Sequence, residues 1–227
     1  MSDVENRRES WSGKRMLNVK KVFIADDHAI FREGLKRLIA KSAQFVVTDE
    51  ASDGLEALRK VQEDDFDLVV LDISIPGRNG LELLLDIKKS RPKLPVLIMS
   101  MYPAEQFALR AYKAGAAGYL TKGGPAEELF DALQRIAQGK RYVGQALAEA
   151  LADGLGNENA RSLHDELSIR EYQVLCKIAS GIKPQQIAEE LGMGVKTVGT
   201  YRSRILQKMR MKSNAELTRY VLEHGLS

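Results

Sequence analysis

Leu68-Val69-Val70-Leu71-Asp72 is the segment most informative about the fold class, because four consecutive apolar residues are followed by an aspartate. A short apolar run of this composition is typical of a strand buried on both faces. Similar runs end at Asp26-Asp27, at Ser100 and at Lys122. Helical patterns separate the runs, and this alternation predicts an α/β domain with a parallel sheet covered on both faces.

We expect a flavodoxin-like sheet of five parallel strands in the order 2-1-3-4-5. Helices are expected at about 30–41, 54–64, 80–90, 104–114 and 125–138. The chain organisation that follows is a disordered tail at 1–18, an α/β domain at 19–140, a linker at 141–163 and a helical domain at 164–227.

Five polar residues stand where these strands end. Ligands of open parallel sheets bind beyond the carboxyl ends of the strands, so one edge should gather Asp26, Asp27, Asp72, Ser100 and Lys122. Clustered carboxylates repel unless a cation joins them, and Mg²⁺ prefers such oxygen ligands. Any one of these residues alone is better explained as a cap, a turn residue or a solvated lysine. Together they predict a phosphoryl-accepting site.

Each residue of this predicted site has a role. Asp72 is the nucleophile that becomes an aspartyl-phosphate, and Asp26 and Asp27 hold the metal. Lys122 supplies the counter-charge for the phosphoryl group, and the Ser100 hydroxyl donates a hydrogen bond to it.

Composition excludes several classes of protein. An apolar content of 44% with 29% charged residues is ordinary for a globular protein, and no run approaches the ~18 apolar residues of a membrane span. The lone Cys176 fits a reducing cytoplasm and is expected in a core. His164 and His224 have no partner at metal-ligand spacing and are expected to be solvated.

Charge is uneven along the chain. Residues 20–140 carry 18 basic and 18 acidic side chains, whereas 164–227 carry 10 and 7. Residues 195–212 contain six basic side chains and no acid. This pattern indicates a neutral domain joined to a smaller one with a local basic stripe.

The last 60 residues have a wholly helical pattern. Capping boxes are predicted at Ser168–Glu171 and Ser213–Glu216, and Gly192 ends one helix just before another begins near Val195. This spacing predicts a helix-turn-helix. The expected DNA-facing residues share much of one face of the second helix, namely Lys196, Thr197, Thr200, Arg204 and Lys208. A solvated basic face is the alternative.

The first domain resembles the receiver domain of two-component response regulators. The resemblance rests on Asp26-Asp27-His28, on 71–77, on Met99-Ser100 and on 115–122. It implies phosphorylation of Asp72 by a histidine kinase, and Mg²⁺ held by Asp27, Asp72 and the Ser74 backbone carbonyl with help from Asp26. Tyr119 matches the family's switch aromatic. For His28, packing and a loop role are expected, and Gly123-Gly124 stands where many members have proline.

The second domain resembles the LuxR-type helix-turn-helix through Leu167–Glu171, 187–192 and 195–202. A receiver followed by this domain is similar to the NarL/FixJ group of transcription regulators. The resemblance implies double-stranded DNA as a partner, a homodimer when active, and Tyr201 and Arg202 as further DNA-binding residues. Three departures are Gly194 in place of the usual serine cap, Gly199 within the helix, and Tyr201 in place of a common histidine.

The leading hypothesis is therefore a phosphorylation-controlled, DNA-binding transcription regulator in the cytoplasm. It is not an enzyme beyond phosphotransfer to its own Asp72 and slow hydrolysis. Alternatives are a constitutive DNA-binding regulator, a protein-binding adaptor, and a phosphatase that uses Asp72. Against the phosphatase, Ser74 stands where one phosphatase family has a second aspartate. Against the adaptor stands the basic stripe at 195–212.

Overall fold

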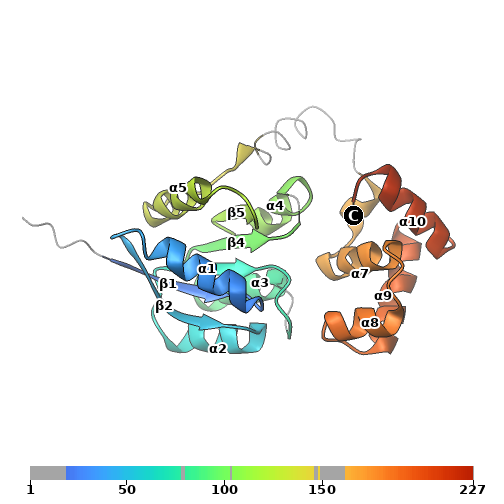
Figure 1. The fold of residues 1–227 in the computed structure, drawn as a ribbon, viewed down its shortest axis with the longest axis horizontal. Helices are drawn as coiled ribbons and strands as arrows, with labels where there is room; N and C mark the ends of the chain where they lie inside the picture. The colour runs from blue at the N-terminus through green and yellow to red at the C-terminus, as the bar shows by residue number, and fades with distance from the viewer. Residues whose placement is uncertain (1–18, 78–79, 103, 146–147, 149–161, 227) are drawn as a thin grey trace, which may run out of the picture.

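The computed structural model describes residues 19–77, 80–102, 104–145, 148 and 162–226 (Figure 1). The tail predicted at 1–18 lies outside the described residues, and so does most of the linker predicted at 141–163. Both therefore stay predictions.

A five-stranded parallel sheet forms the first half of the chain, in the order β2-β1-β3-β4-β5. The strands are β1 (Lys20–Ala25), β2 (Phe45–Ala51), β3 (Leu68–Asp72), β4 (Val96–Ser100) and β5 (Gly118–Thr121). The helices are α1 (Ala29–Ile39), α2 (Gly54–Glu63), α3 (Gly80–Ser90), α4 (Ala104–Lys113) and α5 (Ala126–Ala137). The predicted fold class and strand order are confirmed, and helix ends agree with the prediction to within two residues.

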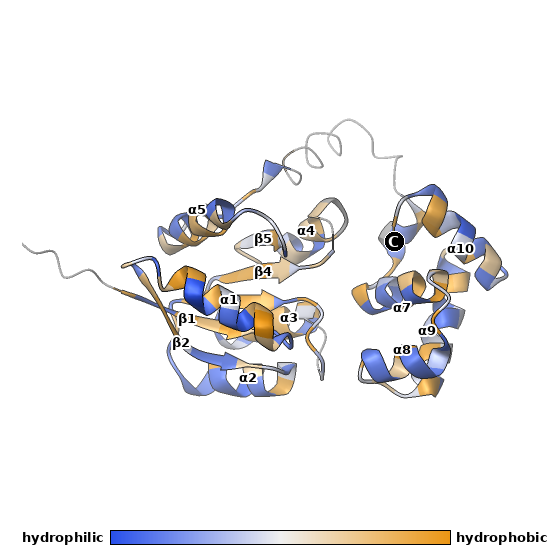
Figure 2. Cartoon of the chain, in the orientation of Figure 1, coloured by the Kyte–Doolittle hydropathy of each residue, from blue (hydrophilic) through white to orange (hydrophobic). Residues whose placement is uncertain are grey.

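Two apolar layers cover the sheet. One packs α1 and α5 on Val22, Ile24 and Val70, and the other packs α2, α3 and α4 on Phe23, Val69 and neighbouring strand residues. In Figure 2 strand β4 lies toward the hydrophobic end of the scale, whereas the helices carry both colours. Burial on both faces is the reason β3 and β4 are continuous apolar runs rather than alternating ones.

The second half is helical, with a 3₁₀ helix η2 (Leu163–Glu166) before four α-helices. These are α7 (Ile169–Ala179), α8 (Pro184–Glu190), α9 (Val195–Lys208) and α10 (Asn214–Glu223). Gly192, at φ +61°, ends α8 in a conformation that favours glycine. Within the described ranges, no helix has the length and apolar character needed to cross a bilayer.

The two predicted capping boxes differ. At α7 the box is complete, because the Ser168 hydroxyl accepts from the Glu171 N–H and the Glu171 carboxylate accepts from the Ser168 N–H. At α10 the Ser213 hydroxyl accepts from the Glu216 N–H, but the Glu216 carboxylate accepts from the N–H of Lys212 at 3.0 Å. The second prediction is therefore only half right.

The predicted solvation of His164 is wrong. Its side chain is buried, and Nδ1 lies 3.0 Å from the Tyr220 hydroxyl. Tyr220 in turn stacks on the ring of His224 at 3.9 Å between centroids. Cys176 donates to the Leu226 carbonyl at 3.2 Å, and burial raises the pKa of its thiol to about 11. A thiol of that pKa carries almost no thiolate at neutral pH, which agrees with a packing role.

Gly80 lets α3 begin against the end of β3. A Cβ built there would lie 2.5 Å from the Ile73 Cα and 2.8 Å from the Asp72 carbonyl oxygen. Apart from the chain neighbours and backbone of its own helix turn, no described heavy atom would lie within 4 Å of a Cβ built at Gly199, inside α9.

Gly80→Ala is expected to lower the free energy of unfolding by roughly 1–3 kcal/mol, because backbone atoms cannot yield as a flexible side chain can. Gly199→Ala is the matched control and is expected to raise that free energy by up to about 1 kcal/mol. Urea denaturation of both variants measures the difference. Equal effects of the same sign would mean that the close approach at Gly80 has no energetic weight.

Candidate functional site

Three strand ends bring a buried ionic cluster to the carboxyl edge of the sheet. The Lys122 ammonium, just after β5, lies 2.6 Å from Asp26 Oδ2 and 2.8 Å from Asp72 Oδ2. All three side chains are buried, with the two aspartates each 2% exposed. A buried charge needs a partner of opposite sign. Here one lysine serves two carboxylates, so the cluster keeps a net negative charge.

Both carboxylate oxygens of Asp72 have partners. Oδ1 accepts from the Ser74 N–H at 2.9 Å, and Oδ2 accepts from Lys122. Burial is the largest influence on this group and raises the pKa of the Asp72 carboxyl above its usual range, although Lys122 acts in the opposite direction. The carboxylate is thus held in one orientation by two donors and is poorly solvated, which favours reaction with a phosphorus centre.

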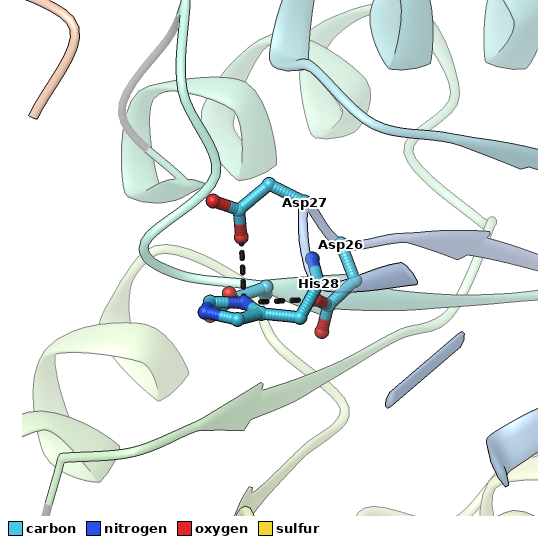
Figure 3. A group of neighbouring side chains, drawn as sticks. Asp26, Asp27 and His28 are labelled. Carbon is cyan, nitrogen blue, oxygen red and sulfur yellow. Dashed lines mark hydrogen bonds and ion pairs between the residues drawn. The ribbon is translucent and has the colours of Figure 1, made fainter. Parts of the chain in front are cut away.

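Asp27 and His28 form the exposed side of the same cluster. The His28 ring Nδ1 lies 2.8 Å from Asp27 Oδ1 and 3.3 Å from Asp26 Oδ1 (Figure 3). The expected packing role of His28 is wrong, because its side chain is 61% exposed and meets carboxylates. Its backbone belongs to the loop, since its N–H donates to Asp26 Oδ1.

The donor set suits a hard divalent cation. Ligand atoms of Asp26, Asp27, His28 and Asp72 all lie within 4.8 Å of one another. Three carboxylates supply the oxygen ligands that Mg²⁺ prefers, and the exposed Asp27 leaves one side open to water. Imidazole is not a typical Mg²⁺ ligand, so His28 fits better as a neighbour than as a ligand.

Ser100 and Tyr119 are joined through Tyr102. The Ser100 hydroxyl accepts from the Tyr102 N–H at 3.1 Å, and the Tyr119 hydroxyl donates to the Tyr102 carbonyl at 2.9 Å. Ser100 follows Met99, which pairs with Asp72 in the sheet. Tyr119 is buried here, and its hydroxyl therefore links the residue of the predicted switch to the same loop that Ser100 contacts.

The loop after Lys122 takes a conformation that proline cannot adopt. Gly123 has φ +97°, whereas proline is restricted to about −65°. The glycine that replaces proline at this position therefore fits the observed loop conformation. Lys122 still reaches both aspartates.

On α9, most of the predicted DNA-facing residues form an exposed stripe. Its members are Lys196, Thr197, Thr200 and Arg204, all exposed. The opposite side of the helix is buried through Val198, Ile205 and Met209. Gly194 caps the helix without a side-chain bond. The result is a supported helix that presents cations and hydroxyls to solvent.

Three other predicted DNA-facing residues have partners within the domain. Lys208 donates to Glu171 Oε2 at 2.6 Å and to the Glu166 carbonyl at 3.1 Å. Arg202 donates to Asn214 Oδ1 at 2.7 Å, and Tyr201 is half-buried against the core. Lys208 thus connects α9 to the start of α7, and its predicted contact with DNA remains only a prediction.

A contact between the two halves of the chain was not predicted from the sequence. The Tyr172 ring on α7 meets the rings of Tyr102 and Phe107 edge to face, with centroids 5.8 and 5.0 Å apart. The Gln173 side chain is almost fully buried, and its Nε2 donates a hydrogen bond to the Ser74 hydroxyl at 3.2 Å. An aromatic or amide side chain on a predicted helix can pack in the core of its own domain or against another domain. The sequence pattern does not distinguish these two cases.

Two arginines extend this interdomain contact. Arg170 donates to the Ile75 carbonyl at 3.4 Å, and Arg110 on α4 donates to the Leu167 carbonyl. Ser74, Ile75 and Tyr102 belong to the loops that follow β3 and β4. The contact is therefore built on the same loops that carry the ionic cluster.

Comparisons with known proteins agree with this architecture. Residues 22–134 match the model of the response regulator receiver domain, and 165–221 match the bacterial regulatory proteins of the luxR family. Response regulator GacA of Pseudomonas aeruginosa is 35% identical over 207 residues, which cover 91% of this chain and 97% of that protein. Oxygen regulatory protein NreC of Staphylococcus carnosus is 35% identical over 213 residues, covering 91% and 98%.

Solved structures give the same result. A two-component response regulator of the LuxR family from Aurantimonas sp. is 35% identical with a TM-score of 0.58, covering 61% of this chain and 99% of that chain. RcsB from Salmonella enterica serovar Typhimurium, bound to a promoter with the phosphomimetic BeF3⁻, has a similar fold, with 24% identity, a TM-score of 0.64 and coverage of 90% and 98%. The chain belongs to the two-component response regulators of the NarL/FixJ group, with a receiver domain and a LuxR-type DNA-binding domain.

Proposed function

We propose that this response regulator accepts a phosphoryl group on Asp72 from a histidine kinase and that the modification controls how the chain acts on double-stranded DNA. The observation that carries the proposal is the buried Asp72–Lys122–Asp26 cluster. The loop that follows Asp72 also contacts the DNA-binding domain. Because bacterial DNA lies in the cytoplasm, we place the protein there.

The chemistry follows from the partners of Asp72. One carboxylate oxygen forms a bond to phosphorus, the phosphorus–nitrogen bond of the donor histidine breaks, and the imidazole leaves with the electron pair and takes up a proton. The carboxylate oxygen that reacts loses the hydrogen bond that it now accepts. Lys122 can then donate a hydrogen bond to a phosphoryl oxygen instead. The Ser74 N–H keeps the other oxygen in place.

Mg²⁺ would be held by Asp26, Asp27, Asp72 and the Ser74 backbone carbonyl. When bound, the ion would neutralise charge on the transferring group. Apart from this self-modification and its slow reversal, we assign the chain no enzymatic activity.

Tyr102 offers the route from this site to the second domain. A phosphoryl oxygen that accepted from the Ser100 hydroxyl would draw its oxygen away from the Tyr102 N–H, from which that oxygen now accepts. A shift of Tyr102 would weaken its edge-to-face contact with Tyr172. The loop containing Ser74 would move with it, and Ser74 is bonded to Gln173. Opening this contact would free α7 and α4 surfaces, and we propose that a homodimer then forms.

Phosphorylation is therefore expected to shift oligomeric state and DNA affinity together. The test compares chains with and without a phosphodonor by sedimentation and by titration of one DNA site. A change of about 1.4 kcal/mol in the domain equilibrium would alter the populations tenfold. If both measurements stay the same, a constitutive DNA-binding regulator becomes the better description.

A matched pair of variants isolates the interdomain contact. Gln173→Ala removes the bond to Ser74 and is expected to shift the unphosphorylated chain toward the phosphorylated behaviour. Gln186→Ala changes an exposed glutamine on α8 and should leave the behaviour unchanged. Identical effects of the two variants would show that the interdomain contact does not control the DNA-binding domain.

A further inference from the structure

A second hollow lies at the opposite, amino-terminal edge of the sheet. It has a volume of about 370 Å³ and is bounded by the starts of β1 and β2, the ends of α3 and α5, and the segments before β4 and β5. Small-molecule sites commonly run from roughly 300 to 1,000 Å³. The phosphoryl chemistry proposed at the carboxyl edge makes no use of this pocket.

The lining of this amino-edge pocket is strongly basic. It contains five cationic side chains and one carboxylate, namely Lys20, Lys88, Lys93, Lys140, Arg141 and Asp67. Asp67 already accepts from Lys20 Nζ at 3.0 Å and from the Lys21 N–H at 2.9 Å. The other four cations have no carboxylate among the lining residues to neutralise them. The surplus is local, because residues 20–140 as a whole are electrically balanced.

Two of these cations have partners that are not acids. Lys88 is half-buried and donates to the Leu94 carbonyl at 2.6 Å. Burial and the nearby Arg141 both lower the pKa of Lys88. Gly115, at φ +100°, lies against the lysine stem, and a Cβ there would come within 3.2 Å of Lys88 Cγ. The Arg141 guanidinium lies 5.9 Å from the centroid of the Tyr112 ring. Positioned cations without a carboxylate partner are suited to an external anion.

The inner walls of the pocket are apolar. Phe45, Leu68 and Ile136 line it and are buried in the core that α5 forms on the sheet. We propose that this pocket binds a small organic phosphate with a flat apolar moiety, the chemistry of a mononucleotide. The cations would contact phosphate oxygens and the apolar walls would contact the base. The only carboxylate lining the pocket is paired with Lys20, so the ligand would be bound rather than turned over.

The test uses ADP as the probe and isothermal titration of the full chain, with EDTA present so that metal-bound nucleotide cannot occupy the aspartate cluster. Saturable binding of one ADP per chain is expected. Lys93 and Lys140 are exposed, so Lys93→Glu/Lys140→Glu should keep the fold while weakening binding at least tenfold. Lys183→Glu/Arg219→Glu gives the same change in net charge at exposed positions outside the pocket and should bind normally.

Two reference ligands separate the parts of the probe. Adenosine lacks the phosphates and pyrophosphate lacks the apolar moiety, so each should bind at least tenfold more weakly than ADP. Protection of Lys88 and Lys93 from lysine acylation by ADP, mapped by mass spectrometry, supplies a test without substitutions. Equal affinity for pyrophosphate and ADP would overturn the assigned ligand class. Loss of binding in Lys196→Ala/Arg204→Ala, or in both charge-reversed pairs alike, would overturn the location. No binding of ADP at millimolar concentration would overturn the site altogether.

Discussion

Asp72→Asn is expected to abolish acyl-phosphate formation, because an amide of the same shape cannot attack phosphorus. The wild-type chain should be labelled on Asp72 when treated with acetyl phosphate and Mg²⁺. Peptide mapping by mass spectrometry locates the modification. Chelation by EDTA should also remove labelling, since three clustered carboxylates need a cation before a further anion can approach.

The choice of variants guards against loss of fold. Asparagine keeps the volume of Asp72 and can still accept from the Ser74 N–H. Asp65→Asn is the matched control, because Asp65 is an exposed carboxylate that pairs with Arg91 far from the cluster. It should be labelled like wild type. Full labelling of the Asp72 variant would disprove the assignment of the nucleophile.

The removal of two cations from α9 is expected to cause a large loss of affinity for DNA. Lys196→Ala/Arg204→Ala should weaken binding to duplex DNA by at least about 100-fold, because each bond to a charged group is worth roughly 1.5–3 kcal/mol. The slope of log affinity against log salt should become less steep by about two, since each lost phosphate contact contributes about 0.9. Both side chains are exposed, so the fold should be unaffected.

Arg219→Ala provides the comparison for this experiment. Arg219 is an exposed cation on α10 that pairs with Glu223, and its loss should leave the salt slope unchanged. Lys208→Ala should behave differently from both, because Lys208 holds the buried Glu171 of α7. We expect it to lower the stability of the domain. An unchanged salt slope for the Lys196/Arg204 pair would mean that α9 does not face DNA.

The sheet and its ionic edge were predictable because strand ends can be read directly from the sequence. Each buried run stops at a polar residue, and parallel topology brings such ends together. Asp26, Asp72 and Lys122 meet as this logic requires. The buried side of α9 was equally readable from helical spacing.

What could not be predicted depends on contacts between distant segments. Nothing in the spacing of Gln173 shows that it bonds Ser74, which lies 99 positions earlier. The burial of His164 depends on Tyr220 of the last helix. Lys208 has the spacing of a DNA-facing residue, yet it reaches a carboxylate on another helix. Periodicity assigns a side chain to a face but does not identify what lies opposite that face.

The α9 stripe is accessible to solvent while the interdomain contact is formed. This accessibility limits how much phosphorylation can increase DNA binding. The resting chain already presents Lys196 and Arg204 to solvent. Basal promoter occupancy should therefore be measurable and should rise with the amount of protein in the cell. A signal can improve on that basal level only by the free energy stored in the contact, and couplings of this kind are typically about 1–3 kcal/mol, or about 5- to 150-fold. Expression level and kinase input would thus be partly interchangeable, and overproduction alone should imitate stimulation.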